Sequence, residues 1–186
     1  MKTGYRHLPL LILRNSGFKS NNTNIIAMKI RQILLNINNA YIFFCSSIYL
    51  GMFWTLHFFW FPNYPSTLNI NNYYDAIIPQ TETATKYFFI TIPIMAVALV
   101  IMLISEWKTK LRWVPLAWIP GLLIPVIVQQ KYIEGINDQF KAGITDPVKL
   151  QELLQEWMFL NDIRFYILMV MWGITMYFFI AKVRKA

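Results

Sequence analysis

Charge is scarce in this sequence. Only 14% of its 186 residues are Asp, Glu, Lys or Arg, whereas about a quarter are charged in an ordinary soluble domain. Hydrophobic residues make up 56% and aromatic residues 17% of the chain, and its mean hydropathy is +0.41. A soluble core of this size does not account for that excess, so we expect lipid to surround much of the chain.

Cysteine and histidine are almost absent. The single cysteine, Cys45, excludes an intrachain disulfide and a cysteine-based zinc site, and its apolar surroundings favour a packed side chain over a reactive thiol. Two histidines, His7 and His57, are too few for a histidine-rich metal centre. The sequence also lacks a phosphate-binding loop and a glycine-rich dinucleotide fingerprint. We therefore expect neither a metal nor another cofactor.

Long apolar segments are what the sequence does contain. Four of them stand out, at about 40–61, 87–104, 114–128 and 163–181. Each is close to the roughly 20 residues that cross a hydrocarbon layer as a helix. We predict an all-α fold in which residues 38–183 form a four-helix transmembrane bundle with up-down-up-down topology.

The segments that flank and connect these spans alternate in charge. Six basic residues and no acid precede the first span, and three basic residues follow the last. The connection between the third and fourth spans carries three lysines against six acids. The positive-inside rule then predicts a multi-pass protein of the cell membrane with both termini in the cytoplasm. The basic residues do not interleave with aromatics in a polar stretch, so we expect a lipid bilayer and no nucleic acid as partner.

Residues 1–37 are interpreted as a basic, disordered cytoplasmic arm. A second methionine, Met28, opens MKIRQILL just before the first span. The upstream part is therefore either such an arm or an over-extended gene start.

The connection between the third and fourth spans has helical signals of its own. Asp146 followed by Pro147 is a typical helix start, and leucines recur after it at helical spacing. The third span likewise continues as a helical pattern through residues 129–140, and Gly143 is placed to end it. We expect these two helices to form a hairpin that extends outside the membrane.

The stretch EWMFLNDIRFYILMVMW, residues 156–172, carries a resemblance. A tryptophan, an asparagine four residues on and an arginine three further on open the last membrane helix. This pattern resembles the anthrone oxygenase-like family of small four-span membrane proteins, much of which is classified only as a domain of unknown function. Gly51, Pro62 and the stretch VQQKYIEGIN are similar in a looser way. The resemblance covers residues 38–183 and implies a four-helix membrane bundle. Characterised relatives oxidise anthrones to anthraquinones without a known metal or flavin.

Trp157, Asn161 and Arg164 are spaced to lie on one face of the last helix. Arg164 lies about one turn inside the outer end of its predicted span, where a guanidinium needs a partner or a route to the interface. Candidate partners at that depth are His57, Glu82, Gln129 and Gln130.

Two interpretations of this outer polar layer are open. In the functional one, His57 and Arg164 are catalytic: His57 acts as acid or base, and Arg164 binds an anionic or enolate-like oxygen. The substrate-binding residues are then Glu82, Gln129, Asn137, Trp157 and Asn161. In the structural one, these groups satisfy one another, with Arg164 paired to Glu82 and His57 in the aromatic belt at the headgroup level.

Two classes of function follow. The first is a membrane protein of the anthrone oxygenase-like family that works as a cofactor-independent oxidase or oxygenase on a lipophilic or aromatic substrate. The second is a non-enzymatic subunit or assembly partner. It docks onto another membrane protein, or onto a second copy, through Leu153, Trp157 and Leu160 of the external hairpin. A channel is disfavoured, because four spans without a mid-membrane charge offer no ion path.

Overall fold

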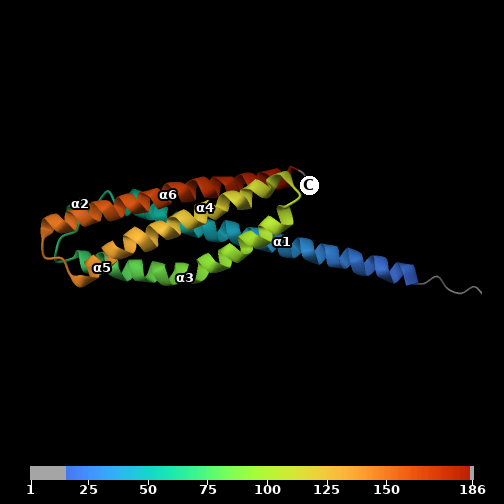
Figure 1. Ribbon diagram of the computed structural model, residues 1–186, viewed down its shortest axis with the longest axis horizontal. Coiled ribbons are helices and arrows are strands. Elements are labelled where there is room, and N and C mark those ends of the chain that lie inside the picture. The colour runs from blue at the N-terminus through green and yellow to red at the C-terminus, as the bar shows by residue number, and fades with distance from the viewer. Residues whose placement is uncertain (1–15, 185–186) are drawn as a thin grey trace, which may run out of the picture.

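The computed structural model describes the backbone of residues 16–184 and the side chains of residues 25–184. All regular structure in this part of the chain is helical, as predicted. Four helices are long and apolar enough to cross a membrane: Ile25–Trp60, Tyr73–Glu106, Lys110–Ala142 and Pro147–Val183. They lie along one another in an elongated bundle (Figure 1). The chain therefore has the architecture of a membrane protein.

The first long helix starts much earlier than the sequence predicts. It consists of α1 (Ser16–Thr55) and a π-helical turn, η1 (Leu56–Trp60). The structure describes a helix over residues 16–37, where the sequence predicts a disordered arm, and no proline interrupts the backbone hydrogen bonds there. This part of α1 extends away from the other helices (Figure 1), and nearly all side chains of residues 25–37 are exposed. Residues 1–15, the rest of the predicted arm, lie outside the described residues.

The other elements follow in order: α2 (Tyr64–Thr67), α3 (Tyr73–Glu106), η2 (Lys110–Arg112), α4 (Trp113–Val128), η3 (Gln129–Ile133), α5 (Glu134–Ala142) and α6 (Pro147–Val183). The predicted start of the last helix is confirmed, since the Asp146 side chain accepts a hydrogen bond from the backbone N–H of Val148 at 2.9 Å. The predicted end of the preceding helix is confirmed too. Gly143 follows it with a φ of 91°, which favours glycine.

Two large apolar cores lie at opposite ends of the bundle. The first, which we call the lobe core, joins α2, α5, the start of α3 and the first part of α6; its most deeply buried members are Ile77, Phe140, Leu150 and Leu154. The second core lies at the end of the bundle away from the lobe core. It joins residues 42–45 of α1, 95–102 of α3, 114–122 of α4 and 171–178 of α6. A small cluster of Tyr49, Phe53, Phe165 and Leu168 lies between the two along α1 and α6. Figure 1 shows α2, α5 and the start of α6 together at one end.

We call the end of the bundle that contains the lobe core the lobe. Outside the lobe, the bundle exposes large apolar side chains. Phe89 and Ile104 on α3 are 81% and 70% exposed, and α4 and α6 expose Leu123 and Val170 by 53% and 57%. Water does not favour such a continuous apolar surface, but hydrocarbon does. These faces indicate where lipid surrounds the bundle.

Candidate functional site

Arg164 is the centre of the polar cluster in the bundle. It lies near the middle of α6, roughly 26 Å along the helix axis from Pro147 at about 1.5 Å per residue. Its side chain is buried, with 6% exposed. Nη1 donates to Gln129 Oε1 at 2.6 Å and to Asn161 Oδ1 at 3.0 Å, and Nη2 donates to the Tyr49 hydroxyl at 3.2 Å. Three helices thus hold one guanidinium group.

Among the described side chains, no acid balances the charge of Arg164. Within residues 25–184, no carboxylate forms an ion pair with Arg164. Its Nε is buried and has no hydrogen-bond partner among the described residues. The Phe53 ring lies against the guanidinium, with 4.7 Å from Cζ to the ring centroid, and offsets part of the desolvation cost. A buried charge with only neutral partners still costs free energy, so this site favours an anion.

A chain of hydrogen bonds connects Arg164 to the lobe core. Asn161 Nδ2 donates to the Trp157 carbonyl at 2.8 Å, and Trp157 Nε1 donates to Asn137 Oδ1 at 3.1 Å. With the bonds from Arg164, this chain contains most of the residues that the sequence singled out: Gln129, Asn137, Trp157, Asn161 and Arg164. The structure therefore brings these five together on facing helices.

Glu82 does not belong to this cluster. Its carboxylate pairs with Lys141 of α5 at 3.3 Å, and both side chains are nearly half exposed. The predicted pairing of Glu82 with Arg164 is therefore wrong, because α3 runs beside α5 in the lobe and presents Glu82 to the nearest lysine there. Gln130 is exposed and makes no described bond to Arg164. Of the candidate partners, Gln129 alone hydrogen-bonds Arg164 among the described residues.

His57 contacts a different face of α6. Its Nδ1 lies 2.7 Å from Asp162 Oδ1, and its ring stacks on Phe165 with 4.7 Å between centroids. Asp162, Phe165 and Tyr166 share a face that is rotated by roughly a quarter turn or more from the face of Arg164. An ionised Asp162 accepts a hydrogen bond from Nδ1, so Nε2 is then the basic nitrogen of His57. The structure thus separates the two predicted catalytic side chains into adjacent clusters.

Both clusters include a widened helical turn. His57 belongs to η1, where the Phe61 N–H donates to the Leu56 carbonyl at 2.8 Å. Gln129 begins η3, and its carbonyl accepts from the Glu134 N–H five residues on. Turns of this π type are rare and occur frequently at functional sites, because the extra residue changes the direction in which side chains point.

The residues of these clusters that the sequence does not single out include Tyr49, Phe53 and Asp162. Tyr49 and Phe53 are i, i+4 neighbours on α1 that resemble any other aromatic in an apolar run, so no signal distinguishes them. Asp162 directly follows Asn161, and in the sequence it contributes only to the acidic charge of the connection before the last span. Asp162 lies two residues before Arg164, so helical spacing places it on another face of the helix. This spacing is the signal in the sequence that separates Asp162 from the Arg164 cluster.

Two of the three predicted docking residues of the hairpin are not on its surface. Leu153 and Trp157 are each 4% exposed, and both belong to the lobe core. The prediction that they contact a partner is therefore wrong. They pack within the lobe because α2 and α5 cover that face of α6. Leu160 is half-buried against the same core.

The fold and the polar cluster together define an all-helical membrane protein with a buried cationic centre. No group of three or more His, Cys, Asp or Glu side chains suited to a metal occurs in the part of the chain that the structure describes. Comparisons of the chain with protein-family models, with curated proteins and with solved structures found no match. The resemblance to the anthrone oxygenase-like family therefore stays a prediction from the sequence.

Proposed function

We propose that this protein is an integral membrane protein that binds a lipophilic molecule through an anionic or enolate oxygen, with Arg164 as the binding cation. The observation that carries the proposal is the buried guanidinium of Arg164, which has no acid as partner and retains an unpaired Nε–H within the part of the chain that the structure describes. A ligand oxygen supplies both the missing charge and the missing acceptor. Hydrogen bonds to charged groups contribute about 1.5–3 kcal/mol.

The proposed setting is a four-helix bundle with up-down-up-down topology and both termini in the cytoplasm. Its support is the charge alternation of the flanking and connecting segments together with helix length. At about 1.5 Å per residue, α3 and α6, with 34 and 37 residues, are roughly 50 and 55 Å long. A hydrocarbon layer of about 30 Å leaves part of each helix outside, and the lobe is the more polar part. Arg164 then lies below the lobe, near the outer interface.

The resemblance to the anthrone oxygenase-like family suggests a reaction for this site. In this proposal His57 removes a proton from the methylene group of an anthrone-like substrate, and Arg164 stabilises the resulting enolate oxygen. Molecular oxygen accepts the electrons. One of its atoms becomes the new quinone oxygen and the other leaves as water with the two hydrogens of the methylene group. Binding at Arg164 does not depend on this reaction, so the two can be tested separately.

Replacing Arg164 with methionine tests the binding proposal. The probe is dodecanoate, titrated into the protein in nanodiscs. We expect the affinity to fall by roughly tenfold to a hundredfold, because the charge-assisted hydrogen bonds are lost. Lys141→Met is the matched control: it removes a cation from the lobe surface and should leave the affinity unchanged. Equal affinities of the wild type and Arg164→Met contradict the proposal.

Replacing His57 with glutamine tests the proposed chemistry. With anthrone as substrate, oxygen consumption should fall by about a hundredfold or more, since a positioned general base contributes about 10²–10⁴ in rate. Asp162→Asn should also lower the rate, because the amide no longer fixes the Nδ1–H form of His57. Dodecanoate affinity should stay the same in both variants. Unchanged oxygen consumption in His57→Gln excludes the proposed base.

A further inference from the structure

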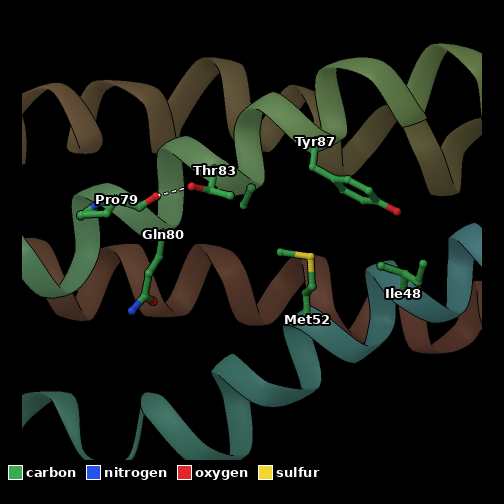
Figure 2. A pocket seen from close by; sticks show the side chains of 7 residues that line it. Ile48, Met52, Pro79, Gln80, Thr83 and Tyr87 are labelled. Carbon is green, nitrogen blue, oxygen red and sulfur yellow. Dashed lines mark hydrogen bonds between the residues drawn. The ribbon is translucent and has the colours of Figure 1, made fainter.

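An open groove runs between α1 and α3 on the side of the bundle (Figure 2). Its volume is about 570 Å³, which lies within the range of small-molecule sites. Figure 2 shows Ile48 and Met52 of α1 across the groove from Thr83 and Tyr87 of α3. The lining residues are Ile48, Met52, Pro79, Gln80, Thr83, Ala84 and Tyr87.

The walls of the groove suit an aliphatic chain. Ile48, Met52 and Ala84 present only apolar atoms to it. The Thr83 hydroxyl donates to the Pro79 carbonyl at 2.8 Å, so this polar group is already satisfied (Figure 2). The groove opens sideways from the bundle, between two helices that are apolar and long enough to cross a membrane. An aliphatic occupant can enter it from the side of the bundle, along the apolar part of α3 that begins near Tyr87.

Aromatic residues adjacent in sequence to the groove residues contact the cationic centre. Ile48 and Met52 are the chain neighbours of Tyr49 and Phe53, the two α1 residues that contact Arg164. The Tyr49 ring packs on Phe88 of α3, with 4.1 Å between centroids, next to the groove residue Tyr87. The Tyr49 hydroxyl accepts from Arg164 Nη2 at 3.2 Å. Tyr49 thus contacts both Arg164 and the part of α3 that borders the groove.

We infer that the groove between α1 and α3 binds the aliphatic chain of a single-chain lipophilic anion, such as a fatty acid, that enters from the bilayer and places its anionic group at Arg164. This inference rests on the proposed function, because the uncompensated charge of Arg164 selects the anion. The apolar walls select the chain, and Tyr49 lies between the two parts of the ligand.

Photo-crosslinking locates the chain directly. The wild-type protein in nanodiscs is irradiated with dodecanoate that carries a diazirine near its methyl end, and the labelled residues are mapped by mass spectrometry. Labels on Met52, Thr83 or Ala84 that an excess of plain dodecanoate removes are the expected result. Labels elsewhere, labels that resist competition or an absence of labelling overturn the inference.

Filling the groove tests the same inference by affinity. Ala84→Trp should weaken dodecanoate binding by about tenfold or more, because the chain loses apolar contact area, and should leave the binding of hexanoate almost unchanged. Met52→Trp is the second groove variant, and Phe89→Trp is the matched control at an exposed position outside the groove. If Arg164→Met weakens dodecanoate binding while both groove variants bind it normally, the groove inference fails and the proposed function stands. If Arg164→Met leaves the affinity for dodecanoate unchanged, the proposed function fails, and the groove inference that rests on it fails with it.

Discussion

Gln129→Glu is expected to stabilise the folded protein and to weaken its binding of dodecanoate by roughly a hundredfold. Gln129 Oε1 lies 2.6 Å from Arg164 Nη1, so a glutamate of nearly the same shape places a carboxylate against the guanidinium. Charge-assisted hydrogen bonds are about twice as strong as neutral ones, and a built-in acid then occupies the cation that the ligand needs. We expect a gain of about 1–2 kcal/mol in the free energy of unfolding, reduced by the partial exposure of Gln129.

The loss of affinity should exceed that of any other single variant except Arg164→Met, and we expect roughly a hundredfold change. Chemical unfolding in detergent measures the first effect, and titration of dodecanoate in nanodiscs measures the second. Gln130→Glu is the matched control, since it adds the same charge one residue away on an exposed side chain. The proposal is wrong if the two variants bind dodecanoate equally well.

Lys182→Met is expected to destabilise the fold much more than Glu106→Gln. Glu106 at the end of α3 is buried, with 3% exposed, and pairs with Lys182 of α6. Its other oxygen accepts from the Thr109 hydroxyl at 2.7 Å. Removing the lysine leaves a buried carboxylate without a cation, which typically costs about 3–5 kcal/mol. Removing the carboxylate instead leaves Lys182 free to be hydrated, since that side chain is 41% exposed.

A double variant makes this asymmetry testable. Glu106→Gln combined with Lys182→Met should recover most of the stability that Lys182→Met loses, because no buried charge remains unpaired. Lys141→Met breaks the exposed pair with Glu82 and should cost about 1 kcal/mol or less. Chemical unfolding of all four variants in the same detergent provides the comparison. If Lys182→Met and Glu106→Gln lose similar amounts of unfolding free energy, Glu106 is not the buried charge at the end of α3.

The main helices could be predicted from the sequence because their signals are local. Apolar length alone predicts four membrane-crossing helices, and the cap at Asp146 together with Gly143 predicts the ends of two of them. The start of α1 at Ser16 could not be predicted in the same way. A basic terminal segment is expected to be disordered, although nothing in the sequence from Ser16 to residue 37 prevents a helix.

Part of the candidate site could also be predicted from the sequence, because that part depends on spacing within a single helix. Trp157, Asn161 and Arg164 share a face by helical spacing, and that relation follows from the sequence alone. Which residue of another helix meets Arg164 depends on the rotation and depth of that helix. The π-helical turn at Gln129 and the pairing of Glu82 with Lys141 depend on this placement of one helix against another, which the sequence alone does not show. Such tertiary choices explain why Gln129 contacts Arg164 and Glu82 does not.

Solid-state NMR tests the central claim most directly, namely that Arg164 is a cation that binds an anionic group. The protein is labelled with ¹⁵N in its arginines and reconstituted in lipid with dodecanoate labelled with ¹³C at its carboxylate. We expect dipolar coupling between the carboxylate carbon and a guanidinium nitrogen, and loss of that coupling in Arg164→Lys. An absence of coupling in the wild type, or a coupling that persists in Arg164→Lys, contradicts the claim.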